Sequence, residues 1–215
     1  WLRHEINKVK LLTGITGINM KTPVPTLMLS LIALLSSIDL AMGQSQDEVT
    51  RLEVQGVYFE RFRSLCGARF EGQSVFPEDP GDDFRDQLLV AKIDSCSAAE
   101  IRIPFIVGEN HSRTWVLKKT DDGLQLKHDH RHEDGTADDI TLYGGTATGP
   151  GTHQSQSFPA DAYTASLIPE AATNEWILSL SEDGSEITYY LERHKKARFK
   201  AILKRVPQAG VDTGQ

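Results

Sequence analysis

Apolar and polar residues alternate with a period of two through most of the chain beyond Gly67, and turn residues interrupt the alternation at short intervals. Such alternation is typical of strands that bury one face. Asp121-Asp122-Gly123 and Asp183-Gly184 are tight-turn sequences between alternating segments, which indicates hairpins. We predict nine strands: Ala68–Phe76, Gln87–Asp94, Glu100–Val107, Arg113–Thr120, Leu124–Glu133, Ile140–Thr146, Asn174–Leu180, Glu186–Arg193 and Ala197–Arg205.

One amphipathic helix is predicted before these strands, over 45–65. Ser45 and Glu48 fit a capping box, the apolar residues follow helical spacing, and Gly67 suits the left-handed residue after a helix end. The expected fold class is therefore mainly β, an antiparallel barrel or sandwich of about nine strands preceded by one helix. A helix beside such a meander is similar to the lipocalin-like (calycin) barrels. The lipocalin signature motif is missing, so this likeness concerns the fold alone.

The first forty-three residues are not expected to belong to the fold. Residues 20–43 have the three parts of a secretory signal peptide: a basic start at Lys21, a short apolar run over 27–38, and small residues at Ala41 and Gly43. We expect cleavage before Gln44 and export to the periplasm or the exterior. Residues 1–19 are interpreted as over-extended translation, 44–206 as a single barrel domain, and 207–215 as a disordered tail.

Cys66 and Cys96 are the only two cysteines. In an exported protein they are expected to form one disulfide, although two buried thiols are the alternative. The formal net charge of −7 and the lack of a basic stripe argue against nucleic acid as a partner. They also argue against anionic membrane surfaces, and no stable membrane insertion is expected after signal cleavage.

Three histidines stand within five residues, at His128, His130 and His132. Alternation places them on the same face as Leu124 and Leu126, so we predict that all three point inward and that Asp129, Arg131 and Glu133 face water. Neighbouring imidazoles on one strand face are about 6.6 Å apart. The three histidines are therefore the predicted site, where they would bind a small molecule or, in part, a divalent transition metal.

A zinc site needs three or four ligands, and His111, His153, His194 or carboxylates would have to complete it. The structural alternative is that the ring nitrogens of each imidazole form hydrogen bonds within the fold.

Three functions follow from these interpretations: a binding barrel for a small molecule or metal, a His-dependent or metal-dependent hydrolase, and an envelope structural protein without a ligand. We lean towards a protein that is not an enzyme. Trp115 and Trp176 are expected in the core, and Gly144-Gly145 are expected to allow either a bend or a close approach of two backbones.

Five segments of the chain are familiar in combination: Arg113-Thr114-Trp115-Val116-Leu117, residues 123–135, Leu142-Tyr143-Gly144-Gly145, Phe158-Pro159-Ala160-Asp161-Ala162 and Asn174-Glu175-Trp176. Together they resemble a group of small exported bacterial proteins, and the likeness covers most of the chain after residue 43. It implies a periplasmic or secreted location without implying an activity.

Overall fold

The computed structural model describes residues 46–77 and 84–207. The predicted signal peptide (20–43), the predicted upstream segment (1–19) and almost all of the predicted tail lie outside the described residues. No helix within the described ranges is long and apolar enough to cross a membrane.

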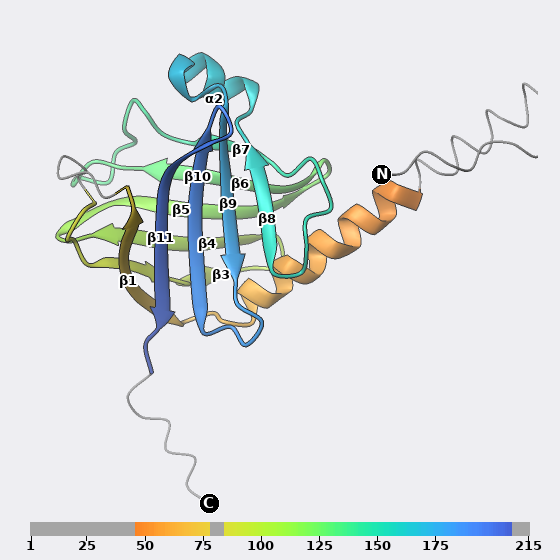
Figure 1. Cartoon of the computed structure of the whole chain (residues 1–215), viewed down its shortest axis with the longest axis horizontal. Coiled ribbons are helices and arrows are strands. Elements are labelled where there is room, and N and C mark those ends of the chain that lie inside the picture. The colour runs from red at the N-terminus through yellow and green to blue at the C-terminus, as the bar shows by residue number, and fades with distance from the viewer. Residues whose placement is uncertain (1–45, 78–83, 208–215) are drawn as a thin grey trace, which may run out of the picture. The chain divides into compact units, whose positions relative to one another are not determined.

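The described chain folds into one antiparallel sheet of eleven strands that curls into a nearly closed barrel (Figure 1). The predicted fold class is confirmed, and the barrel is compatible with a lipocalin-like fold. In Figure 1 strands β8 to β11 run up and down in front, and β4 to β6 cross behind them. The strands are β1 (Arg69–Phe76), β2 (Leu89–Lys92), β3 (Ser95–Cys96), β4 (Glu100–Val107), β5 (Asn110–Thr120), β6 (Gly123–His130), β7 (Tyr143–Thr146), β8 (Ser155–Pro159), β9 (Asn174–Leu180), β10 (Glu186–Arg193) and β11 (Lys196–Arg205).

Two of these strands, β3 and β8, were not among the nine predicted. β3 has only two residues, and β8 carries a single large apolar side chain, Phe158, so neither shows a period of two. Between β8 and β9 the chain forms the helix α2 (Ala162–Leu167) and the 3-10 turn η1 (Pro169–Ala171). Asp161 caps α2 by accepting a hydrogen bond from the backbone N–H of Thr164.

The sheet is a meander in which β7 and β8 form the two ends of the strand order. An isolated bridge between Gly145 and Ala160 brings these ends together. A Cβ atom on Gly145 would lie 1.7 Å from the carbonyl oxygen of Pro159, and one on Gly144 would lie 2.0 Å from that of Leu126. The predicted close backbone approach is confirmed, and the barrel closes here because both positions lack a side chain.

The N-terminal helix spans residues 46–63 and closes one end of the barrel. Tyr58, Phe59 and Phe62 are fully buried in the core. Gln55 donates to the carbonyl of Gly149 at 2.8 Å and accepts from the backbone N–H of Leu124 at 2.9 Å. The helix is thereby held by apolar packing and by hydrogen bonds to the loop after β7 and to the start of β6.

Cys66 and Cys96 lie within disulfide-bonding distance, as predicted, with Cα atoms 6.2 Å apart. The bond connects the segment just after the helix to β3, a strand that pairs only with β4. The disulfide therefore fixes the end of the helix to the same end of the barrel that the helix closes.

Candidate functional site

The end of the barrel opposite the helix contains a cavity of about 560 Å³. Its walls come from the ends of β1, β4, β6 and β10 and from the beginnings of β5, β7, β9 and β11, while Ile168 and Ala171 next to α2 border its mouth. In Figure 1 this is the end at which α2 lies. The barrel is thus filled with side chains at one end and hollow at the other.

Aromatic rings form much of the cavity wall. Trp115 stacks on Phe105 with ring centroids 4.3 Å apart and on Tyr189 at 4.6 Å. The ring of Trp176 lies tilted against that of His128, with centroids 5.2 Å apart. Trp115 and Trp176 are buried, as predicted, but both also line the cavity. Flat apolar rings on two sides suit an aromatic or otherwise apolar ligand body.

His128 is buried and points inward from β6, as alternation predicts. Its Nδ1 lies 3.2 Å from the carbonyl oxygen of Tyr143, and its Nε2 lies 2.7 Å from the hydroxyl of Tyr189. Because a carbonyl can only accept, Nδ1 carries the proton and Nε2 accepts from Tyr189. Burial lowers the pKa of His128 to about 3, so the ring is neutral at physiological pH.

His130, the last residue of β6, is half-buried, and its Nε2 lies 3.1 Å from the hydroxyl of Tyr143. Burial first, and then the positive charge of Arg113, lowers the pKa of His130. His132 lies beyond the strand and is exposed. The three histidines therefore do not form one inward row, because β6 ends before the third of them.

The prediction that Asp129 faces water is wrong, since it is only 3% exposed. Its side chain points away from the cavity, as alternation requires, but the segment 131–142 folds back over it. Thr141 donates to Asp129 at 3.5 Å, Arg131 lies 3.2 Å from the carboxylate, and Arg102 on β4 donates a further hydrogen bond. Alternation correctly predicts that the Asp129 side chain points away from the cavity, but it cannot predict that another segment of the chain buries it.

His128 is the only histidine of the described residues that lines the cavity. His111 and His132 border the same hollow on the surface, His153 lies near the N-terminal helix, and His194 contacts Thr173 at 3.1 Å. Within the described residues, no three His, Cys, Asp or Glu side chains are grouped so that they could hold a metal ion. Metal binding by His128, His130 and His132 stays a prediction.

Arginine is the cavity residue that sequence reasoning missed. Arg113 on β5, Arg193 on β10 and Arg198 on β11 all line the cavity. The sequence does contain a signal for Arg113. The period of two places it on the same inward face of the strand as Trp115 and Leu117, and a charged residue on an apolar face is unusual. The predicted strand begins at Arg113, however, and a charged residue at the first position of a strand does not indicate a site.

The chain was compared with family models, with curated proteins and with solved structures, and nothing matches in any of the three comparisons. The site must therefore be interpreted from its own geometry.

Proposed function

We propose that this protein is a binding module that holds a small organic molecule in the cavity of its barrel. The observation that carries the proposal is the cavity itself, which has a volume of about 560 Å³ and is lined by Trp115, Trp176 and Tyr189. Small-molecule sites are typically concave, mostly apolar and roughly 300–1,000 Å³ in volume. A purely structural barrel would be expected to fill this space with side chains, so the hollow end favours a ligand.

The state of His128 favours binding over hydrolysis. A general base needs a free nitrogen and a pKa near the working pH. Both ring nitrogens of His128 have partners within the fold, and its pKa of about 3 makes it a weak base. We therefore place His128 in the cavity wall as a polar contact that orients Tyr189.

Export is part of the proposal. Three observations support a periplasmic or secreted location: the apolar run and small residues of 20–43, the pairing of Cys66 with Cys96, and the resemblance to small exported proteins.

Metal binding at His128, His130 and His132 is a separate hypothesis. Calorimetric titration of the untagged protein with zinc, copper or nickel tests it, and we would abandon it if no heat of binding appears up to about 100 μM metal.

A fluorescence titration with N-phenyl-1-naphthylamine, an uncharged aromatic probe, tests the proposed function. In a Trp1→Phe background the only tryptophans are Trp115 and Trp176, and both line the cavity. We expect saturable binding of one probe per chain, accompanied by energy transfer from these tryptophans. The proposed function would be overturned if the folded protein showed no saturable binding of this probe or of its sulfonated analogue, 8-anilinonaphthalene-1-sulfonate.

Leu191→Trp sharpens the test, because Leu191 lines the cavity and the larger ring would occupy it. We expect the affinity for the probe to fall at least about tenfold, in line with the sensitivity of packed sites to added volume. Leu52→Trp on the N-terminal helix, where Leu52 is 41% exposed, is the matched control and should leave the affinity unchanged. Equal effects of the two variants would place the probe outside the cavity.

A further inference from the structure

The Arg113 guanidinium faces the aromatic cavity without full pairing. Its Nη1 is buried and has no hydrogen-bond partner among the described residues. Its Cζ lies 5.4 Å from the centre of the Phe84 ring, which packs in turn against Phe199 at 4.9 Å. Because a buried N–H group without a partner costs free energy, the free Nη1 of Arg113 is placed to donate a hydrogen bond to an acceptor on a bound ligand.

The charge of the cavity is one-sided. Arg113, Arg193 and Arg198 line it, and no Asp or Glu of the described chain does so. Arg193 donates to the side chain of Asn174 at 2.8 Å, and this partner carries no charge. In a chain of net charge −7, three arginines around one cavity are a local reversal of sign.

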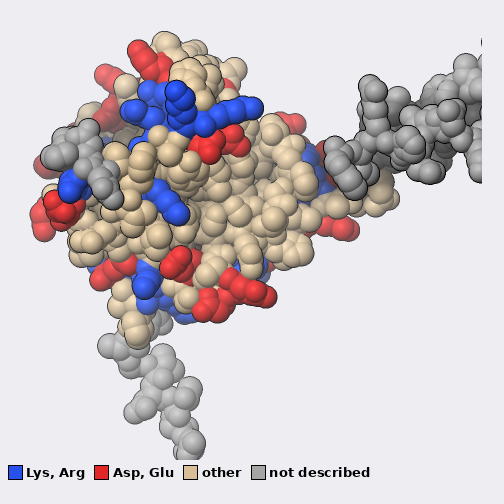
Figure 2. Space-filling view, in the orientation of Figure 1, with Lys and Arg blue, Asp and Glu red and all other residues tan. Residues whose placement is uncertain are grey.

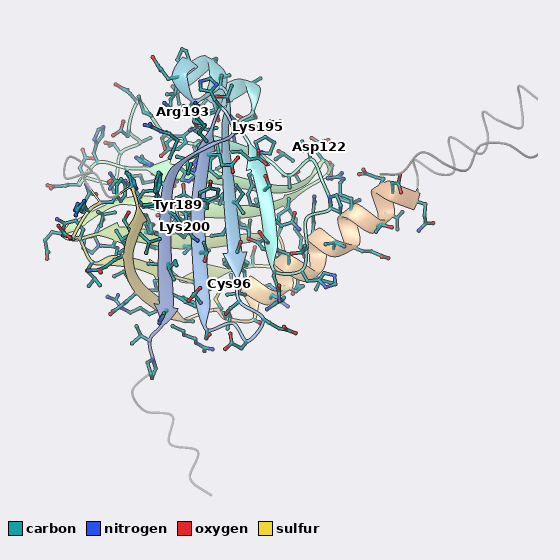
Figure 3. The ribbon with its side chains drawn as sticks, viewed as in Figure 1. Cys96, Asp122, Tyr189, Arg193, Lys195 and Lys200 are labelled. Carbon is teal, nitrogen blue, oxygen red and sulfur yellow. A yellow bond between two sulfur atoms is a disulfide. The ribbon has the colours of Figure 1, made fainter. Side chains whose placement is uncertain are left out.

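The surface around the mouth continues this positive charge. Lys195 lies in the turn between β10 and β11, and Lys196 is the first residue of β11, so both follow closely on Arg193 in the sequence. Figure 3 shows Arg193 and Lys195 at the same end of the strands, above Tyr189. In Figure 2 Lys and Arg side chains gather at this end of the visible face with some Asp and Glu side chains beside them, and a broad uncharged area lies below. Such a field attracts anions towards the opening.

We propose that the cavity selects aromatic molecules that carry an anionic oxygen group, a carboxylate or a sulfonate, and that Arg113 determines this selectivity. The proposal rests on the proposed function and narrows its class of ligand. The rings of Trp115 and Trp176 contact the flat body of the ligand, and the Arg113 fork donates to the anion in a partly water-excluded site. Arginine suits this role because its planar donors match two oxygens of one anionic group.

A matched pair of probes tests the charge requirement. 8-Anilinonaphthalene-1-sulfonate and N-phenyl-1-naphthylamine share one ring system, and only the first carries an anion. We expect the full-length protein to bind the sulfonate more tightly. In Arg113→Gln the affinity for the sulfonate should fall about tenfold to a hundredfold, the range for loss of a charged hydrogen bond. The affinity for the uncharged probe should stay within about twofold, because its contacts are to the rings alone.

Two further variants exclude a general effect of charge. Arg205→Gln removes the same charge from an exposed position on β11 and should leave both affinities unchanged. Arg113→Lys keeps the charge without the fork and should recover part of the lost affinity. Near-ultraviolet circular dichroism of each variant shows whether the barrel is folded.

The outcomes separate the two proposals. If the uncharged probe binds as well as the sulfonate, or if Arg113→Gln weakens both probes equally, the charge selectivity is wrong and the binding function stands. If the preference for the sulfonate survives in folded Arg113→Gln, the assignment to Arg113 is wrong. If neither probe binds the folded wild-type protein, the proposed function fails, and this inference fails with it.

Discussion

Both ends of the barrel are rich in aromatic residues, but one end is fully packed and the other contains a cavity. At the closed end, Tyr58, Phe59 and Phe62 have no exposed surface, and Gln55 is hydrogen-bonded through both its oxygen and its nitrogen. At the open end, Trp115 and Trp176 surround empty space and Arg113 keeps an unpaired donor. One end satisfies the rules of a stable core, and the other departs from them where a ligand would supply the missing contacts.

The comparison predicts that one substitution has unequal costs at the two ends. Phe62→Ala should lower the free energy of unfolding by about 3–5 kcal/mol, because the cavity that it creates cannot fill or collapse fully. Phe199→Ala, at the wall of a space that is already open, should cost less than half as much. Urea unfolding measures both values, and Val57→Ala, at a position 44% exposed, is the control with an expected change under about 0.5 kcal/mol. Equal costs at Phe62 and Phe199 would break the comparison.

The disulfide belongs to the closed end, so its loss should affect stability without affecting the cavity. Replacing Cys66 and Cys96 together by Ala opens a loop of 30 residues in sequence separation. Loop entropy predicts a loss of about 3.5 kcal/mol. The affinity for N-phenyl-1-naphthylamine should stay the same at temperatures where the variant is folded. A large change in affinity would show that the two ends are coupled.

The buried, neutral His128 at the open end should make the stability of the protein depend on pH. An unfolded His128 takes up a proton below pH 6.5, whereas the folded residue stays neutral down to a pKa of about 3. The unfolded state therefore binds the extra proton in this window, and stability falls as the pH falls. Between pH 7 and pH 5 the contribution of this one residue is about 2 kcal/mol.

The His128→Gln variant isolates that contribution. Gln keeps a hydrogen-bonding side chain beside Tyr189 but does not titrate, so its stability should depend less steeply on pH between 7 and 5. His130, whose pKa is also lowered, would account for part of the slope that remains. Identical slopes in the wild type and the variant, measured by urea unfolding at each pH, would contradict the buried neutral state of His128.

Local patterns were enough to predict most of the strands. Three predicted strands, at 100–107, 174–180 and 186–193, have the bounds that the structure shows, because each alternates cleanly between turn residues. The helix was predicted as well, since its cap, apolar spacing and terminal glycine agree. β8 was not predicted, because its pairing with β9 is set by closure of the barrel and leaves little trace in its composition.

The site was predictable only in part, for a physical reason. Alternation placed His128 inside, but the partners of a side chain depend on contacts between residues distant in sequence. The hydroxyl of Tyr189 that meets His128 comes from 61 residues further along the chain, and the cover on Asp129 comes from a segment without regular structure. The sequence predicts a site of three histidines on one strand, whereas the cavity draws its rings and arginines from eight strands.

The smallest expected effect concerns the unpaired donor of Arg113 and has the opposite sign to the others. Arg113→Met removes a charge whose Nη1 is buried without a partner, while the methionine can still pack on Phe84. We expect the unliganded protein to become more stable by up to about 1 kcal/mol, because a buried unsatisfied donor costs free energy that an apolar group does not. The same variant should lose its preference for 8-anilinonaphthalene-1-sulfonate. Chemical unfolding with and without this probe measures both effects. A destabilised variant would mean that the guanidinium already serves the fold, and the open end would then obey the same rules as the closed one.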